Sequence, residues 1–417
     1  MDKHTKAIYQ RGALFVVPIV LIVGCRVGLR ACVAINASER RSSLDDELRR
    51  QEEARKADEI ARASATSEAT QRQRARAIPT APKGMTLAPI ATGQQVPDAL
   101  ALDESNVAWL NTRAGEVVVA PRAGGAPRVV AREQKLPQRR HVQGLALSGG
   151  WVYWFTTSPA NSEDEDGALV RIKADADSGT QPEVVLSDLG GISAIATDKD
   201  SVYFARSRRV SRDEDGGATG GVWRLRLDKK GAPIKDPKNP KQLVAAERPC
   251  AIAVDDAAVF TVEQLKVWRA PKNGGEAKAI VNGADRLGCG LAVDETSVFW
   301  TVPSDDSLMK AKKVDGSSIA VAAFVRKRPA NVVVDRGYAY VIAETSPQAL
   351  GELGSVFRVP ARSEQLAPTP LVTDQVGLQS VAAGGGIVVF SAYNESETDG
   401  VVTKIANDPL AVDAGRP

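Results

Sequence analysis

Short stretches that alternate apolar and polar residues recur along most of the chain, and two neighbouring stretches show the pattern most completely. They read PCAIAVDDAAVFTVEQLKVWRAPKNGGEAKAIV from Pro249 and GCGLAVDETSVFWTVPSDDSLMKAKKVDGSSIAVA from Gly288. Each begins with a small-apolar stretch ending in Asp, turns tightly into alternating Val and aromatic residues, and adds two alternating stretches around a Gly-containing turn. Alternation with a period of two is typical of half-buried strands, so each unit predicts four β-strands in about 40 residues.

Five further stretches repeat the first two strands of this unit: ALALDESNVAWL, GLALSGGWVYWF, AIATDKDSVYFA, NVVVDRGYAYVI and SVAAGGGIVVFS. We name the equivalent residues at the end of the first strand the marker residues; they are Asp103, Ser148, Asp198, Asp255, Asp294, Asp335 and Gly384. Their spacing of 45, 50, 57, 39, 41 and 49 residues is regular, with loops of variable length. Such spacing favours propeller blades over a sandwich or a solenoid. The spacing therefore predicts an all-β fold, a seven-bladed β-propeller of four-stranded blades over residues 85–407. Residues 408–417 are expected to form a disordered tail.

An additional strand pattern, MTLAPIAT from Met85 to Thr92, precedes the first unit, whereas the last unit ends after GVVTKIAN without a fourth strand. Pairing of the two would remove the exposed edges that an open sheet presents. We therefore expect this N-terminal strand to close the ring.

Aromatic side chains recur at one register of the second strand, at Trp109, Trp154, Phe204, Trp300 and Phe390. A period that matches the blade indicates packing between blades rather than a sugar-binding platform.

The first 24 residues have the pattern of an export signal. Lys3, Lys6 and Arg11 precede an apolar run from Ala13 to Gly24, which is too short to span a bilayer comfortably. The following tetrapeptide Ile22-Val23-Gly24-Cys25 resembles a bacterial lipobox, which implies lipidation at Cys25. The alternative is an uncleaved signal anchor that continues to about Ile35 with Arg26 and Arg30 reaching the interface.

Residues 25–84 are the predicted stalk, and from Ser38 to about Ala77 they contain too few large apolar side chains to form a core. Asp45 with Arg49, and Glu52 with Lys56, are acid-before-base pairs four residues apart, which predict a solvated helix over about Leu44–Ala63. A charged helical stalk or a partly disordered spacer fits this composition equally. Either would separate a membrane tether from the propeller.

The charge balance narrows the possible partners. The formal net charge is +3, from 54 Lys and Arg against 51 Asp and Glu, which does not favour nucleic acid. With two histidines and four cysteines, zinc sites built from His and Cys clusters are not expected. No cofactor signature is present, so we expect no cofactor.

The repeated AVDETSVFW pattern with turns such as APRAGG and APKNGG resembles repeats of exported bacterial β-propeller proteins, from about Met85 to Asn407. The resemblance implies the fold and leaves the activity open, because one propeller scaffold supports many functions.

One rim of the predicted ring carries the long insertions, at residues 156–167, 206–221, 343–354 and 391–400. Long loops on a rigid scaffold usually carry function, so this face is the predicted binding face. Its basic residues, with His141 beside them, are the candidate contacts for an anionic glycan: Arg139, Arg140, His141, Arg208 and Arg209. The alternative is that the basic residues neutralise nearby acidic loops.

Three of the long loops are acidic and end in Asp-Gly: NSEDEDG, SRDEDGG and NESETDG. Asp164, Asp166, Asp213 and Asp215 could supply some calcium ligands, although the spacing matches no known calcium loop. An Asp-Gly turn before a strand explains the same residues, and no metal site is expected.

Cys250 and Cys289 each stand five residues before the marker residue of their unit, at matching places in neighbouring blades. An exported protein meets an oxidising compartment, so a disulfide between them is expected if their Cα atoms lie within about 7 Å. Two buried thiols are the alternative, and Cys32 has no expected role.

The sequence favours a non-enzymatic binding or scaffolding lipoprotein, membrane-anchored in the bacterial cell envelope. We expect a monomer that presents its loop-rich face to an envelope protein, a peptide or a glycan. The alternative is a lyase or hydrolase with its site in the mouth of the ring, because streptogramin lyases are seven-bladed and some propeller lyases use a histidine base. Here His141 has no second histidine or evident carboxylate beside it, so no catalytic residue is assigned.

Overall fold

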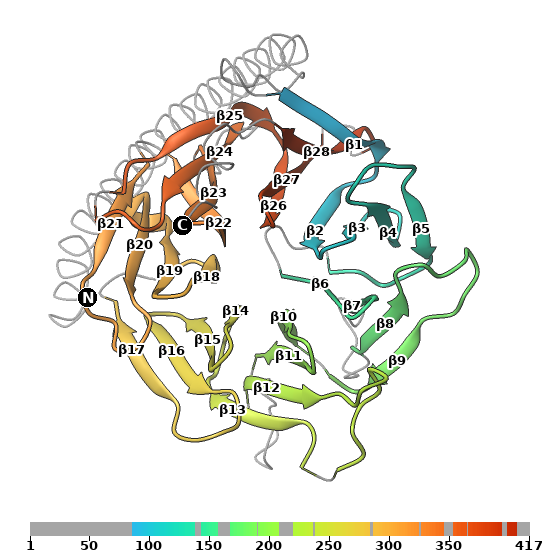
Figure 1. Cartoon of the computed structure of the whole chain (residues 1–417), viewed down its shortest axis with the longest axis horizontal. Helices are drawn as coiled ribbons and strands as arrows, with labels where there is room; N and C mark the ends of the chain where they lie inside the picture. The colour runs from blue at the N-terminus through green and yellow to red at the C-terminus, as the bar shows by residue number, and fades with distance from the viewer. Residues whose placement is uncertain are drawn as a thin grey trace, which may run out of the picture. The chain divides into compact units, whose positions relative to one another are not determined.

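The computed structural model describes residues 86–137, 143–156, 167–189, 191–207, 220–236, 238–283, 287–324, 327–345, 353–364, 366–393 and 398–406. They form seven four-stranded antiparallel sheets arranged in a ring (Figure 1). The predicted all-β fold, a seven-bladed β-propeller, is confirmed. The N-terminal segment with Cys25, the expected stalk helix and the tail at 408–417 lie outside the described residues.

Each sheet is one blade, and in blades 1 to 6 the strands run in chain order from the centre of the ring to its periphery (Figure 1). The innermost strands are β2 (Pro97–Leu102), β6 (Leu145–Ser148), β10 (Ile192–Thr197), β14 (Ala251–Val254), β18 (Leu291–Val293), β22 (Arg328–Asp335) and β26 (Leu378–Gly384). The second strands are β3 (Asn106–Asn111), β7 (Trp151–Phe155), β11 (Ser201–Arg206), β15 (Ala258–Glu263), β19 (Ser297–Val302), β23 (Tyr338–Glu344) and β27 (Ile387–Ala392). The third strands are β4 (Glu116–Pro121), β8 (Leu169–Lys173), β12 (Gly221–Arg226), β16 (Lys266–Pro271), β20 (Ser307–Lys312), β24 (Leu353–Pro360) and β28 (Gly400–Ala406).

The outermost strands of blades 1 to 6 are β5 (Arg128–Ala131), β9 (Glu183–Leu186), β13 (Lys241–Ala245), β17 (Lys278–Asn282), β21 (Ala320–Ala323) and β25 (Thr369–Val376). Blade 7 takes its outer strand from the other end of the propeller. There, β1 (Thr86–Gln94) pairs antiparallel with β28, so the predicted closing strand is confirmed and extends two residues beyond Thr92. A short 3-10 helix, η1 (Pro303–Asp305), follows β19.

The last residue of β1 also binds blade 1. The side-chain oxygen Oε1 of Gln94 accepts hydrogen bonds from Trp109 Nε1 at 3.0 Å and from Asn111 Nδ2 at 3.1 Å. The closing strand therefore joins the last blade to the first through both its backbone and its side chains.

The hydrophobic core of the described residues lies between neighbouring blades. Seven clusters of buried residues each combine side chains from two adjacent blades. The second strands supply both clusters by alternation: Trp154 packs toward blade 1, whereas Tyr153 packs toward blade 3. The five repeated aromatics are at most 2% exposed, which confirms their prediction as core residues.

The marker residues close the turn between the first and second strands. In blade 4, the Asp255 N–H donates to the Ala258 carbonyl at 3.0 Å, and Asp255 Oδ1 accepts from the N–H groups of Ala257 and Ala258 at 2.8 and 2.7 Å. Asp294 makes the same contacts with Thr296 and Ser297. Such turns explain why Asp ends the first strand of most units.

The second carboxylate oxygen of two marker residues binds the next blade. Asp255 Oδ2 lies 2.7 Å from Nζ of Lys313, which follows the third strand of blade 5 and also donates to the Asp294 carbonyl at 2.8 Å. Asp198 makes the equivalent ion pair with Lys272 of blade 4 and accepts a hydrogen bond from Tyr203 at 2.9 Å. We name the end of the ring that carries these turns the turn rim and the opposite end the loop-rich rim.

Burial and hydrogen bonding act in opposite directions on these carboxyls. Burial raises the pKa of Asp255, but hydrogen bonds from Lys313 and from the backbone of Ala258 outweigh it, and the net pKa is lowered. The pKa of Asp198 is likewise lowered, because Lys272 and Tyr203 outweigh the effect of burial. Burial raises the pKa of Tyr203, and the neighbouring Asp198 charge raises it further.

Two other blade junctions on the turn rim use backbone groups. Arg122 of blade 1 donates to the carbonyl of Gly384, the marker residue of blade 7. Asp335 of blade 6 accepts from the N–H groups of Gly385 and Gly386 at 3.1 and 2.6 Å. Positive φ at both glycines, 56° and 81°, presents these N–H groups to the neighbouring blade.

Replacing Lys313 with Met is expected to lower the free energy of unfolding by about 1–3 kcal/mol, since it leaves the partly buried Asp255 without its cation. The measurement is denaturant unfolding at neutral pH. The matched control is Lys278→Met, because Lys278 and its partner Glu276 are 71% and 80% exposed and such pairs contribute little. Equal losses in both variants would contradict the assignment.

The pH dependence follows from the lowered pKa values of Asp198 and Asp255. Their stabilising contribution is complete above the unfolded-state value of about 3.9 and is lost as the pH falls through the lower folded-state value. Unfolding free energy should therefore fall below about pH 4, and the fall should be smaller in Lys313→Met. An acid titration by circular dichroism measures both curves; identical slopes would refute this origin.

Candidate functional site

The inner strands meet the loop-rich rim at one register, five residues before each marker residue. We name the seven residues at this register the axial ring: Asp98, Gln143, Ser193, Cys250, Cys289, Ala330 and Gln379. The inner strands contact one another in sequence around the centre of the propeller (Figure 1). The axial ring therefore brings residues from all seven blades to one end of the axis.

A recurrent β-bulge sets this register. Ser193, Ala330 and Gln379 are each the extra residue at a register shift between the first and second strands. In blade 5, the Gly288 N–H donates to Thr301 O and the Thr301 N–H donates to Gly290 O, so Cys289 is the extra residue there. Bulges take a side chain out of the regular alternation of a strand and are frequent beside functional sites.

Gln143 connects three blades. It precedes β6 of blade 2, yet its main-chain oxygen accepts from the Ile195 N–H of blade 3 at 2.8 Å. Its side-chain Oε1 accepts from the Ile252 N–H of blade 4, also at 2.8 Å. These N–H groups belong to innermost strands, and Gln143 supplies the hydrogen bonds that no further strand provides there.

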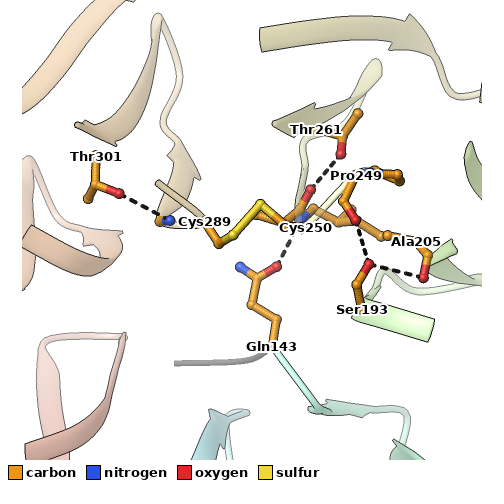
Figure 2. Close-up of a disulfide and its surroundings, with 11 residues drawn as sticks. Gln143, Ser193, Ala205, Pro249, Cys250, Thr261, Cys289 and Thr301 are labelled. Carbon is orange, nitrogen blue, oxygen red and sulfur yellow. Dashed lines mark hydrogen bonds between the residues drawn. A yellow bond between two sulfur atoms is a disulfide. The ribbon is translucent and has the colours of Figure 1, made fainter. Parts of the chain in front are cut away.

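The predicted disulfide between Cys250 and Cys289 is present, with a Cα–Cα distance of 5.4 Å. Figure 2 shows it joining blades 4 and 5, with the Gln143 side chain directed toward the backbone beside Cys250. Thr261 donates to the Ala251 carbonyl at 2.7 Å, and Thr301 Oγ1 accepts from the Gly290 N–H at 3.2 Å. The two threonines thus hold the strand starts on both sides of the bond.

Close packing surrounds the disulfide. A Cβ atom at Gly290 would lie 2.7 Å from Thr301 Cγ2 and 2.9 Å from the Ala330 carbonyl oxygen, so a larger residue would displace backbone. Ser193 Oγ also donates to the Pro249 carbonyl and joins blade 3 to blade 4 (Figure 2). This side of the axial ring is held by covalent and hydrogen-bonded contacts.

The opposite side of the axial ring, at blades 7 and 1, is buried. Asp98 is 4% exposed and Gln379 is 1% exposed, and Ser380 Oγ accepts from the Leu100 N–H at 3.2 Å. Asp98 Oδ1 accepts from the N–H of Ala99, whose φ is +49°. A non-glycine residue with positive φ beside a buried carboxylate is a conformation that concentrates at functional sites.

The chemistry of the axial ring is polar but largely uncharged. It contains one carboxylate, two amides, one hydroxyl, one methyl and the disulfide. Gln143 Oε1 and Ser193 Oγ join neighbouring blades, whereas Asp98 Oδ1 accepts from Ala99 in its own blade. Such a set accepts and donates hydrogen bonds in a rigid frame. Asp98 is the one carboxylic acid among the seven residues of the axial ring.

Lys327 is a half-buried cation in the connection that leads to Ala330. Its Nζ donates to Ser355 Oγ and lies 4.0 Å from Asp374 Oδ1, and it stands over the Phe357 ring at 5.9 Å. Burial lowers the pKa of Lys327, although the Asp374 charge partly opposes the shift. The pairing with Ser355 ties the loop-rich rim to blade 6.

The five residues proposed from the sequence as ligand contacts, Arg139, Arg140, His141, Arg208 and Arg209, lie outside the described residues. The four acidic candidates Asp164, Asp166, Asp213 and Asp215 lie outside them as well. Over the part of the chain that is described, no group of three or more His, Cys, Asp or Glu residues is placed to hold a metal ion. No helix in the described part of the chain is long and apolar enough to span a membrane.

Sequence reasoning identified two members of the axial ring, Cys250 and Cys289, and missed the other five. Aligning the seven units on their marker residues would have revealed the other members, because the position five residues before the marker is polar or Cys in six of the seven units. A polar residue at the start of a buried inner strand departs from the apolar pattern around it.

No family model matches the sequence, and no curated protein matches it. The structure is similar to a streptogramin B lyase, with 14% identity and a TM-score of 0.53 over 77% of this chain and 97% of that chain. It is also similar to a virginiamycin B lyase from Staphylococcus aureus, with 11% identity and a TM-score of 0.50 over 77% and 98% of the two chains. A PQQ-bound aldose sugar dehydrogenase from Streptomyces coelicolor gives 17% identity and a TM-score of 0.44 over 78% and 100%. At these identities the similarities show the propeller fold alone.

Replacing both Cys250 and Cys289 with Ser is expected to lower the free energy of unfolding by about 4 kcal/mol, because the bond closes a loop with a sequence separation of 39. Denaturant unfolding under non-reducing conditions measures the loss. Reductant should lower the wild-type stability toward that of the double variant and leave the variant unchanged. A wild-type curve that coincides with the variant before reduction would contradict the prediction.

Proposed function

We propose that this protein is a non-enzymatic binding or scaffolding protein of the bacterial cell envelope, which holds a protein, peptide or glycan on its loop-rich rim. It acts as a monomer, tethered to a membrane through a lipidated Cys25 or a signal anchor. The observation that carries the proposal is the axial ring, which brings polar side chains of blades 1, 2, 3 and 7 and the disulfide of blades 4 and 5 to one end of the axis.

The rigidity of the axial ring supports binding. The Cys250–Cys289 disulfide and the Gln143 and Ser193 hydrogen bonds hold the inner strands of blades 2 to 5 in place before any ligand arrives. A preorganised surface loses little conformational entropy on association. A polar ligand such as a peptide or a glycan matches the half-buried amide of Gln143 and hydroxyl of Ser193.

The disulfide also supports an exported location. Disulfides persist in oxidising compartments and are rare where thiol reductants are abundant. The export-signal pattern of residues 1–24 is an independent indication from the sequence.

The lyase alternative has less support. The two similar lyases share at most 14% of their residues with this chain, which is too low to carry over an activity. The chain's second histidine, His141, lies outside the described residues, as does His4. A lyase activity that disappears in a His141→Ala variant would contradict the binding proposal.

A bulky residue in the axial ring should block ligand binding. Ala330 is half-buried at the bulge of blade 6, so Ala330→Trp covers the axial ring without removing a side-chain hydrogen bond. In a pull-down of the intact protein from its own envelope, partner yield should fall at least tenfold. Ala257→Trp, at an exposed position on the turn rim, is the matched control and should retain its partner.

Photo-cross-linking separates blocked binding from misfolding. A photoreactive residue at the exposed Arg248, on the loop-rich rim, should label the partner, whereas one at the exposed Asp256, on the turn rim, should not. Labelling from Asp256 alone would show that the turn rim holds the ligand. Equal yields from Ala330→Trp and wild type would remove the axial ring from the binding site.

A further inference from the structure

An extended loop on the turn rim concentrates exposed lysines. Fourteen residues separate β12 from β13, compared with six to nine between the third and fourth strands of the other blades with consecutive strands. We name the described part of this connection, residues 227–236 and 238–240, the lysine loop. It contains Lys229, Lys230, Lys235 and Lys238, all exposed, and Lys241 follows at the start of β13.

The lysine loop is folded by its own side chains. Asp228 Oδ1 accepts from the N–H groups of Lys230 and Ala232, both at 2.8 Å. Asn239 Oδ1 accepts from the Arg226 N–H at 2.8 Å, and its Nδ2 donates to the Ile234 carbonyl at 2.8 Å. These contacts fix the backbone between the lysines.

Blade 2 supports the same loop from outside. Arg171, which is 6% exposed, donates from its guanidinium to the Gly231 carbonyl. The Arg171 guanidinium also stacks over the Trp151 ring at 3.9 Å. The lysines are therefore displayed from a loop anchored on two blades.

The acidic residues of the described loop form no ion pair with its lysines. Asp228 is engaged in its turn, while Asp236 Oδ2 accepts from Arg226 at 2.7 Å and its Oδ1 accepts from the Lys238 N–H at 2.8 Å. Among the described residues, none of the four loop lysines forms an ion pair. The carboxylates shape the loop, and the four ammonium groups face solvent.

We propose that the lysine loop is an electrostatic contact for a membrane surface rich in anionic phospholipids. Lysine is a compact, hydrated point charge that suits a diffuse layer of lipid headgroups, whereas selective binding of one phosphate uses the planar guanidinium of arginine. The loop is the longest of these connections and has no aromatic residue, and four separate exposed charges fit an extended charged plane better than a single peptide or glycan. The inference rests on the membrane tether proposed above, because a tethered domain reaches the bilayer at high effective concentration and needs few contacts.

The test compares the labelling rates of individual lysines by an amine-reactive reagent, read by mass spectrometry. The intact chain is reconstituted in vesicles of phosphatidylcholine alone or with added phosphatidylglycerol, and flotation verifies equal loading. Lys229, Lys230, Lys235 and Lys238 should react at least threefold more slowly on the anionic vesicles, and high salt should remove the difference. Lys266, which is exposed at the start of β16 on the loop-rich rim, should react equally on both.

A variant with all four lysines changed to Gln provides the second arm. Lys241 should be protected by anionic vesicles in the wild type and should lose that protection in the variant. Equal labelling on both vesicles would overturn the proposal. Protection by a soluble polyanion but not by phosphatidylglycerol would overturn it in favour of an acidic macromolecule. These readouts are independent of ligand capture by the axial ring, so either proposal can fail alone.

Discussion

The antiparallel pairing of β1 with β28 is the contact on which the rest of the propeller depends. Each blade buries both of its faces against its two neighbours, in seven inter-blade clusters among the described residues. In an open array, the first and last blades would each leave one apolar face and one strand edge exposed. Closure removes both, and the hydrogen bonds from Trp109 and Asn111 to Gln94 add blade 1 to the same junction.

Closure gives the two rims different properties. On the turn rim, marker residues bind the following blade through charged or backbone groups, as in the Asp255–Lys313 pair, so these residues join neighbouring blades. On the loop-rich rim, the bulges at Ser193, Ala330 and Gln379 release side chains from the regular alternation of the strands. The lysine loop differs from these marker residues. Its four lysines are exposed and form no ion pair among the described residues.

Much of the fold was predictable because the same local pattern occurs seven times. The alternation in AVFTVE and SVFWTV specifies second strands, and the Asp that follows each small-apolar stretch specifies the turn. The repeats also aligned Cys250 with Cys289, and the missing last strand indicated the role of β1. The repeated pattern did not reveal the contacts that marker residues make with the following blade. Lys313 follows the third strand of blade 5, and only the angle between blades brings its Nζ to Asp255 of blade 4.

The sequence by itself therefore determined the architecture, the number of blades, the closing strand and the one disulfide of the described residues. These features depend on short-range periodicity and on the equivalence of positions in successive repeats, both of which are readable along the chain. The tertiary structure alone decided which rim contacts join the blades, that Gln143 binds across blades 3 and 4, and that the lysines of the lysine loop form no ion pair among the described residues. The physical reason is that such contacts depend on the curvature of a closed ring, which brings together groups that no period in the sequence relates.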